Sequence, residues 1–314
     1  MLCYFSLNGN NSSCSSYNII SCVWICLCRL WNCDVTSSGW DDLQSILITN
    51  RFLITLDLSR NKLGDSGIKL LCEGLRDPRC TLQDLRVDGC GVTSSGCDDL
   101  GSILITNRFL TRLNLSRNNL GDSGIKLLCE GLKHPDCTLQ SLRLWECDVT
   151  SSGCDDLRSI LINNRSLIRL NLSHNKLGDS GIKLICRGLR DPRCTLQDLR
   201  VCACDVTFSS YNDLCFIISE NQTLTRLEIS LYGEDDDDDD DDEDDEDNDE
   251  MLEPKWDYCC HVLQNVGFYV DRWEDLLRRR DEGCDIYLRR RRLENGRWEF
   301  LPPFSGDDDD DEGW

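Results

Sequence analysis

Leucine and other apolar residues recur along this chain in one fixed frame, which first appears complete as Leu-x-x-Leu-x-Leu-x-x-Asn at residues 53–61. The next copy, at residues 82–90, closes on Cys in place of Asn. The alternation of apolar and polar positions within each frame predicts a short strand. The residues that close successive frames are 28 and 29 residues apart in strict alternation, and they are Cys33, Asn61, Cys90, Asn118, Cys147, Asn175 and Cys204.

Helices of two alternating types are predicted between these strands. One type is represented by Asn119–Leu132 and the other by Val149–Leu161. Leucines at helical spacing give each helix an apolar face. Short polar side chains suit the helix N-termini, so we expect the first type to be capped by its own Asp122 or Ser123, and the second by Thr150 or Ser151.

A strand and a helix that recur with this period are typical of a leucine-rich-repeat solenoid. One turn of about 28 residues cannot bury its own apolar face, so neighbouring turns must stack. We therefore predict an α/β horseshoe over residues 23–233, with alternating 28- and 29-residue repeats and parallel strands on its concave face. The Asn and Cys residues that close the frames, which we call the ladder, are expected to be buried and to satisfy backbone groups where each strand ends.

Charge is distributed unevenly over the 314 residues. Up to Gly233 the chain has 25 acidic and 24 basic residues, whereas from Glu234 onward it has 32 acidic and 10 basic residues. The net charge of −23 therefore belongs to the C-terminal part. The run Asp235–Glu250 cannot bury enough apolar surface to offset the entropy of ordering it, so we expect residues 234–254 to be a disordered acidic linker.

The two ends of the chain do not follow the repeat frame. We expect residues 1–22 to be an irregular leader and residues 255–314 to be a charged tail. Helical spacing of apolar side chains in this tail predicts one amphipathic helix, and the residues concerned are Val266, Val270, Trp273 and Leu277.

The concave face is the expected binding surface. Side chains that flank the inward leucine of each strand point to this face, because side chains alternate along a strand. The Cys-closed turns share their core residues but differ at the positions just before the Cys, which indicates a variable surface on a fixed frame. Tryptophan beside arginine is common in the hot spots of protein interfaces. The predicted partner-binding residues are Trp31, Arg86, Asp88, Arg143, Trp145, Glu146 and Arg200.

The strict alternation resembles the ribonuclease-inhibitor subtype of leucine-rich repeat. The sequence motifs within the repeats resemble those of the NOD-like receptors (NACHT and leucine-rich-repeat proteins), especially the expanded sets of bony fishes. The residues that carry this resemblance are Leu113–Asn118 (LNLSRN), Leu120–Lys126 (LGDSGIK) and Cys147–Gly153 (CDVTSSG). The resemblance implies a ligand-sensing or autoinhibitory repeat region of a cytosolic immune receptor. The chain has no Gly-x-x-x-x-Gly-Lys-Ser/Thr sequence for a nucleotide.

We therefore predict a non-enzymatic module that docks a protein partner in the concave face, with no cofactor and no metal. The alternatives are an inhibitor of a basic enzyme, in the manner of ribonuclease inhibitor, and a binder of basic proteins such as histones through the acidic run. Nucleic acid and membrane are not expected partners, since no stretch reaches the ~18 apolar residues needed to span a bilayer.

Two further sequence features bear on chemistry and location. Gly-Asp-Ser-Gly occurs at residues 64–67, 121–124 and 178–181 and resembles a serine-protease segment, but three copies at helix starts favour a structural role. Twelve of the 22 cysteines are in phase with the repeats, which predicts reduced thiols in the core. Reduced thiols indicate an intracellular compartment, the cytoplasm with the nucleus as the alternative.

Overall fold

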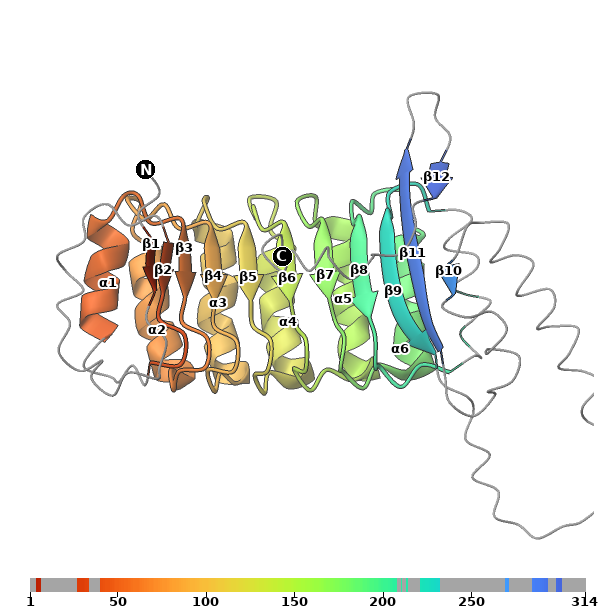
Figure 1. Cartoon of the computed structure of the whole chain (residues 1–314), viewed down its shortest axis with the longest axis horizontal. Coiled ribbons are helices and arrows are strands. Elements are labelled where there is room, and N and C mark those ends of the chain that lie inside the picture. The colour runs from red at the N-terminus through yellow and green to blue at the C-terminus, as the bar shows by residue number, and fades with distance from the viewer. Residues whose placement is uncertain are drawn as a thin grey trace, which may run out of the picture.

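The computed structural model describes residues 4–6, 27–33, 40–207, 210, 213, 221–231, 269–270, 284–292 and 298–300. Its strands lie side by side in one sheet, and its helices form a second layer behind them (Figure 1). Among the described residues, no helix has the length and apolar character needed to cross a membrane.

Eight of the strands pair in parallel in the order of the chain, as predicted. In chain order they are β2 (Leu27–Arg29), β3 (Thr55–Asp57), β4 (Asp84–Arg86), β5 (Arg112–Asn114), β6 (Ser141–Arg143), β7 (Arg169–Asn171), β8 (Asp198–Val201) and β9 (Arg226–Leu231). Strands β2 to β8 have three or four residues and include the second apolar position of their frame, whereas β9 has six residues.

A helical segment follows each strand from β2 to β7, and after β6 it is divided into a short 3-10 helix and an α-helix. The helical segments are α1 (Trp40–Thr49), α2 (Gly64–Leu75), α3 (Ser94–Thr106), α4 (Gly121–Leu132), η4 (Ser151–Gly153), α5 (Cys154–Asn163) and α6 (Gly178–Leu189). The Gly-Asp-Ser-Gly type begins three residues after its ladder asparagine, whereas α3 and η4 begin four residues after their ladder cysteines.

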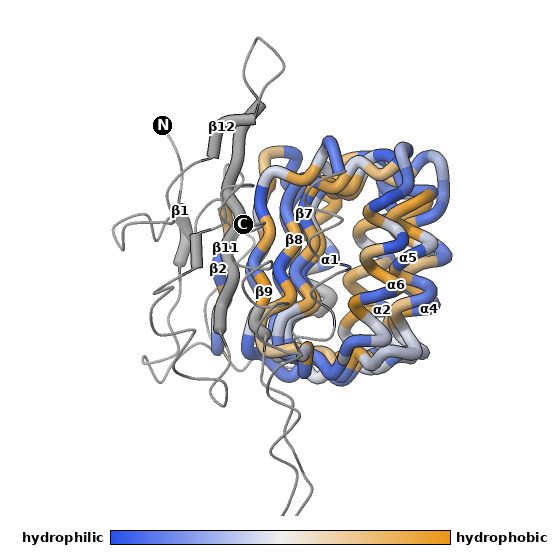
Figure 2. Tube along the Cα trace, turned by 90° about the vertical axis from the view of Figure 1, so that its right-hand side faces the viewer, coloured by the Kyte–Doolittle hydropathy of each residue, from blue (hydrophilic) through white to orange (hydrophobic). Residues whose placement is uncertain are grey.

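The apolar core lies between the two layers (Figure 2). The middle residue of each strand points into it, as Leu85 and Leu142 do, and both are almost fully buried. The apolar stripe of each helix closes the core from the other side, with Ile125 and Leu128 as examples. Burial removes apolar surface from water along the whole array, which is the main force that stacks the repeats. The leucine-rich-repeat solenoid predicted from the sequence is thus confirmed.

Four strands lie outside the predicted repeats and pair with the sheet or with one another. Strand β1 (Tyr4–Ser6), in the predicted leader, pairs in parallel with β2. Strand β11 (Cys284–Arg292) pairs with β9 in the antiparallel direction, so the sheet is parallel only from β1 to β9. Strand β10 (Tyr269–Val270) also pairs with β11.

The remaining short strand is β12 (Trp298–Phe300), which pairs with β11 as well. Of the amphipathic helix predicted in the tail, Tyr269 and Val270 are strand residues in the structure, and the rest lies outside the described residues. The predicted acidic linker also lies outside them.

Candidate protein-binding site

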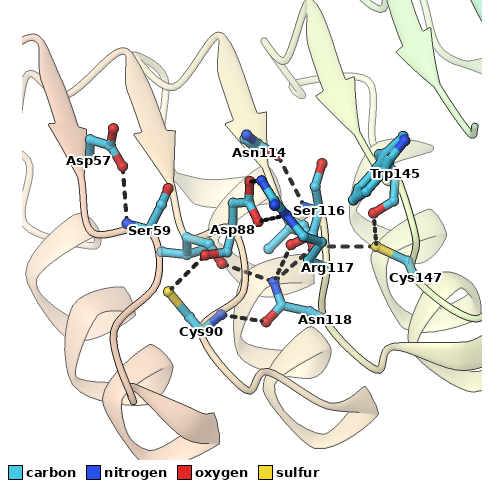
Figure 3. Close-up of polar contacts among 12 residues, drawn as sticks. Asp57, Ser59, Asp88, Cys90, Asn114, Ser116, Arg117, Asn118, Trp145 and Cys147 are labelled. Atoms are coloured by element: carbon cyan, nitrogen blue, oxygen red, sulfur yellow. Dashed lines mark hydrogen bonds and ion pairs between the residues drawn. The ribbon is translucent and has the colours of Figure 1, made fainter. Parts of the chain in front are cut away.

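The frame that presents the site is held together by the ladder. Asn118 donates from Nδ2 to the carbonyl oxygens of Val87 at 2.9 Å and Leu115 at 2.8 Å, one in the preceding repeat and one in its own. Its Oδ1 accepts from the backbone N–H groups of Cys90 at 3.0 Å and Val92 at 2.9 Å. Asn118 is therefore bonded on both polar atoms where the strand turns away (Figure 3). Asn175 repeats this arrangement one double repeat later.

The ladder cysteines continue the chain of contacts with a weaker donor. The Sγ of Cys90 lies 3.2 Å from the carbonyl oxygen of Leu58, and the Sγ of Cys147 lies 3.3 Å from that of Leu115. A thiol can donate one weak hydrogen bond and accepts poorly, so it satisfies one carbonyl where asparagine satisfies several groups. Each repeat is thus bonded through its ladder residue to the repeat before it.

A second row of buried asparagines lies at the far end of the strands and was not anticipated from the sequence. Asn164 donates from Nδ2 to the carbonyl oxygen of Leu132 at 2.7 Å, and its Oδ1 accepts from the backbone of Leu167. The signal that could have revealed this row is the spacing of 57 residues between its members, which are Asn50, Asn107, Asn164 and Asn221.

The Gly-Asp-Ser-Gly segments join consecutive repeats. Asp122 does not cap its own helix; its carboxylate accepts from the backbone N–H of Thr150 at 2.8 Å and from the Thr150 hydroxyl at 2.6 Å. Thr150 in turn accepts from the N–H of Ser152, so the predicted cap at Thr150 is confirmed. The cap predicted at Asp122 or Ser123 is wrong, since the N-cap of α4 is Leu120 without a side-chain bond. The same Asp–Thr bridge joins Asp65 to Thr93 and Asp179 to Thr207.

Two columns of side chains cover the surface of the sheet turned away from the helices, which we call the strand face. The first residue of each strand forms the first column, and the third residue forms the second. From β3 to β9 the first column is Thr55, Asp84, Arg112, Ser141, Arg169, Asp198 and Arg226. The second column is Asp57, Arg86, Asn114, Arg143, Asn171, Arg200 and Glu228.

The predicted arginines of the second column lie on this face, and two of them pair with acids. Arg86 lies 3.3 Å from the Asp84 carboxylate, which also pairs with Arg112 at 3.2 Å. Arg200 lies 3.2 Å from the Glu228 carboxylate, and burial lowers the pKa of its guanidinium. The third, Arg143, is half-buried at the centre of the sheet. Much of the charge on this face is therefore balanced within it.

Beyond the strand ends, a row of large polar and aromatic side chains crosses successive repeats. We call it the edge row, and its members are Trp31, Arg60, Asp88, Arg117, Trp145 and His174. Three of the predicted residues, Trp31, Asp88 and Trp145, belong to it. Glu146 follows Trp145 in an exposed turn with a φ of 53°, in the left-handed region that a glutamate seldom adopts.

Arg117 is the central contact of the edge row (Figure 3). Its Nε and one terminal nitrogen each lie 2.8 Å from an oxygen of Asp88, a bidentate pair. On its other side the guanidinium lies over the Trp145 ring, 5.2 Å from the centroid. His174 packs against Trp145, and their ring centroids are 4.7 Å apart. The four side chains therefore hold one another in place, from four consecutive repeats.

Arg60, Arg117 and His174 were not predicted as binding residues from the sequence. Each directly precedes a ladder asparagine and has a φ between 55° and 58°, so the alternation of a strand does not predict where its side chain points. The sequence does contain a signal for these residues. The position between the invariant Ser and the ladder Asn changes from Arg60 and Arg117 to His174, which is typical of a variable surface position.

The thiols of the described region are free and nearly all buried. The twelve cysteines in phase with the repeats are all buried, as predicted. Burial raises the pKa of Cys90 and Cys147 to about 12, so these thiols stay protonated at neutral pH. Among the residues that the structure describes, no three His, Cys, Asp or Glu side chains are grouped as a metal site.

Comparison with known proteins points to the same class. The family model described as Leucine Rich repeat matches residues 49–72, 106–129 and 163–186. Human NACHT, LRR and PYD domains-containing protein 12 is 46% identical over 191 residues, which cover 61% of this chain and 18% of that protein. NACHT, LRR and PYD domains-containing protein 3 of Mus musculus is 45% identical over 202 residues, 64% of this chain and 20% of that protein.

Ribonuclease inhibitor of Mus musculus is 40% identical over 201 residues, which cover 64% of this chain and 44% of that protein. The chain thus spans about a fifth of the NACHT relatives and less than half of ribonuclease inhibitor. Its repeats form a leucine-rich-repeat region of the kind found in ribonuclease inhibitor and in the NACHT- and LRR-containing NOD-like receptors.

Proposed function

We propose that this region is a non-enzymatic protein-binding module and that its partner docks on the strand face, centred on the edge row. The observation that carries the proposal is the Asp88–Arg117–Trp145–His174 cluster. Trp and Arg are the side chains most often found in interface hot spots. Here they are held by a bidentate ion pair and by ring contacts, so little side-chain entropy remains to be lost when a partner binds.

By analogy with its NACHT-containing relatives, we propose that the module serves ligand sensing or autoinhibition in an innate immune receptor. Its free, buried thiols support an intracellular compartment, since reducing conditions keep cysteines unpaired. The Gly-Asp-Ser-Gly segments support a non-enzymatic role, because their aspartates serve as bridges between repeats.

Photo-crosslinking tests where a partner binds. A benzophenone amino acid at Glu146, exposed beside Trp145, is expected to capture a protein partner from cell extract, whereas the same probe at Lys126 on the helix layer is not. With the captured partner purified, Trp145→Ala should weaken binding by about 2 kcal/mol, close to 30-fold. Unchanged affinity would remove the edge row from the site.

The likeness to ribonuclease inhibitor favours one second candidate, inhibition of a basic enzyme. An inhibitor of a basic enzyme needs acidic side chains that are available to the enzyme. Here Asp88 is paired with Arg117, and Glu228 forms ion pairs with Arg200 and Arg226. We therefore expect a pancreatic-type ribonuclease to keep its full activity in the presence of an excess of this protein. Inhibition at nanomolar concentration would instead establish this second function. Histone binding through the acidic run is distinguished by its loss at moderate salt.

A further inference from the structure

Two arginines of the edge row are equivalent in sequence but differ in their surroundings. Arg60 and Arg117 lie one double repeat apart, each directly before a ladder asparagine, with left-handed φ values of 58° and 55°. The guanidinium of Arg60 lies over the Trp31 ring, 5.1 Å from its centroid, and that of Arg117 lies over Trp145 at 5.2 Å. The two stacks therefore match, and the difference is in the acids around them.

Arg117 has an acid in each neighbouring repeat. Asp88, 29 residues before it, accepts two hydrogen bonds of 2.8 Å from the guanidinium. These hydrogen bonds raise the pKa of Arg117, and the charge of Glu146, 29 residues after it, adds to the rise. The charge of Arg117 is thus balanced within the chain.

Arg60 has neither of these acids. Trp31 stands 29 residues before it and Gly89 stands 29 residues after it. Asp88 belongs to the next repeat, but both of its carboxylate oxygens are bonded to Arg117. Within the part of the chain that the structure describes, the exposed guanidinium of Arg60 is therefore stacked on Trp31 but forms no hydrogen bond and no ion pair.

Gly89 leaves one flank of Arg60 open. A Cβ on Gly89 would lie 3.9 Å from the Cγ of Arg60 and 3.9 Å from the Cβ of Arg117, so a side chain at this position would stand beside both arginines. The equivalent positions of the other repeats that end on a ladder cysteine all have side chains, and they are Asn32, Glu146 and Ala203. The place that Glu146 has beside Arg117 is thus open beside Arg60.

We propose that Arg60 is the docking point for an acidic side chain, Asp or Glu, of the protein partner, an inference that rests on the edge row as the binding site. A guanidinium stacked on a ring keeps its N–H groups in its own plane, where they can bind both oxygens of a carboxylate. Trp31 holds Arg60 in this orientation and, at 37% exposure, offers the partner an apolar contact beside the charge. The partner's carboxylate completes at Arg60 the pair that Asp88 completes at Arg117.

Selection from a random peptide library displayed on phage tests this inference with the full-length chain as bait. Clones are kept that bind the native chain but not the Trp145→Ala variant, so that they report on the edge row. We expect the kept peptides to share an Asp or Glu. Replacing that residue by Asn or Gln in a synthetic peptide should weaken binding at least tenfold, as measured by fluorescence anisotropy.

Arg60→Gln should weaken binding of the selected peptide by a similar factor and leave the affinity for its amide version unchanged. Lys62→Gln removes the same charge from an exposed side chain two residues away and should change neither affinity. Kept peptides without a shared acid, or with an affinity that Arg60→Gln does not change, would overturn the inference but leave the edge row as the site. If no clone depends on Trp145, the edge-row proposal falls and this inference falls with it.

A second pair of variants retains Arg60 and adds the missing acid. Gly89→Glu introduces the residue found at Glu146, and Gly89→Gln has nearly the same size without the charge. This position accepts a side chain in the left-handed region, since Glu146 and Ala203 have φ values of 53° and 49°. Gly89→Glu should bind the selected peptide at least tenfold more weakly than Gly89→Gln, because its own carboxylate pairs with Arg60. Equal affinity of the two variants would contradict the role of Arg60.

Discussion

At the scale of single residues, the asparagines of the ladder form more hydrogen bonds than its cysteines. The side-chain amide of Asn118 reaches the backbone of two repeats and uses both its nitrogen and its oxygen. The thiol of Cys90 reaches one carbonyl of the preceding repeat through a weak donor. Stability should therefore depend far more on the asparagines than on the cysteines.

Replacing Asn118 by Ala is expected to lower the free energy of unfolding by about 4 kcal/mol, because several buried backbone groups lose their partners. Cys90→Ala, the matched change in the adjacent repeat, should cost about 1 kcal/mol, since it removes a weak bond and little volume. Urea unfolding followed by circular dichroism measures both. Equal losses would mean that the amide bonds add nothing beyond packing.

Asp84 and Asp198 occupy the same place in their repeats but differ in environment. Asp84 has two ion pairs, whereas Asp198 Oδ1 has no hydrogen-bond partner within the described part of the chain. Burial raises the pKa of Asp198 from 3.8 to about 6, and Glu228 adds to the rise, while Arg226, Arg200 and Arg169 oppose it. A raised carboxyl pKa stabilises the fold fully below about pH 4, and this contribution is lost as the pH rises through 6.

The substitution Asp198→Asn removes this dependence. At pH 7.5 it should raise the free energy of unfolding by about 2 kcal/mol, and near pH 4 it should change it little, because Asp198 is then protonated. Asp84→Asn should be destabilising at pH 7.5, since Arg86 and Arg112 both lose their partner. Urea titrations at the two pH values compare the variants. Destabilisation by Asp198→Asn at pH 7.5 would contradict the raised pKa.

At the scale of elements, each helix start is organised by the repeat before it. Asp122 bonds Thr150, and Gly153 leaves room for its carboxylate, because a Cβ on Gly153 would lie 2.6 Å from the Asp122 Oδ1. Gly96 has the same relation to Asp65. The two halves of this contact are therefore fitted to each other and should be energetically coupled.

A double-mutant cycle tests this coupling. Gly153→Ala alone should destabilise by about 2 kcal/mol through the clash, and Asp122→Ala alone by a similar amount through lost hydrogen bonds. In the double variant the carboxylate that clashes is gone, so the total loss should fall short of the sum by about 1 kcal/mol. Strict additivity, measured by urea unfolding, would show that the two residues act independently.

The Asp–Thr bridges between repeats were only partly predictable from the sequence. The period of the frame and its inward leucines predicted the strands and the core, because side-chain spacing follows directly from strand and helix geometry. Asp122 suited an N-cap by type, but type does not tell which helix it serves. The clue was its constant offset of 28 residues from Thr150, repeated at Asp65 and Thr93.

The binding surface was predictable only in part, for a similar reason. Trp31, Asp88 and Trp145 were anticipated as binding-face residues, whereas Arg117 and His174 were not, because left-handed turn residues break the two-residue alternation. The pairing of β11 with β9 was not predicted either. An antiparallel strand from outside the repeats has no periodic signal to identify it.

At the scale of the whole molecule, the array forms one continuous core in which thiols are distributed from end to end. Raised pKa values and burial together protect those thiols from alkylation. Cys202 is the half-buried exception among the free cysteines of the described region. Reaction with thiol reagents should thus report how the solenoid opens.

With iodoacetamide at pH 8.5, Cys202 is expected to react before the described buried thiols, of which Cys90, Cys147 and Cys204 react only at the rate of unfolding of the array. Peptide mapping by mass spectrometry at increasing times gives the order, and mild urea should accelerate the three ladder thiols together. Modification of Cys147 before Cys202 would show that the middle repeats open independently of the rest.

The two-repeat period of these contacts limits how such a gene can change in length. Each ladder asparagine accepts a hydrogen bond from the backbone N–H of the ladder cysteine in the repeat before it. Each bridging aspartate accepts one from the threonine at the start of the next helix. Excision or duplication of 57 residues restores all of these pairings at the new junction, whereas loss of a single repeat sets two turns of the same type side by side. Recombination within the coding sequence should therefore leave viable proteins only when repeats are gained or lost in whole pairs.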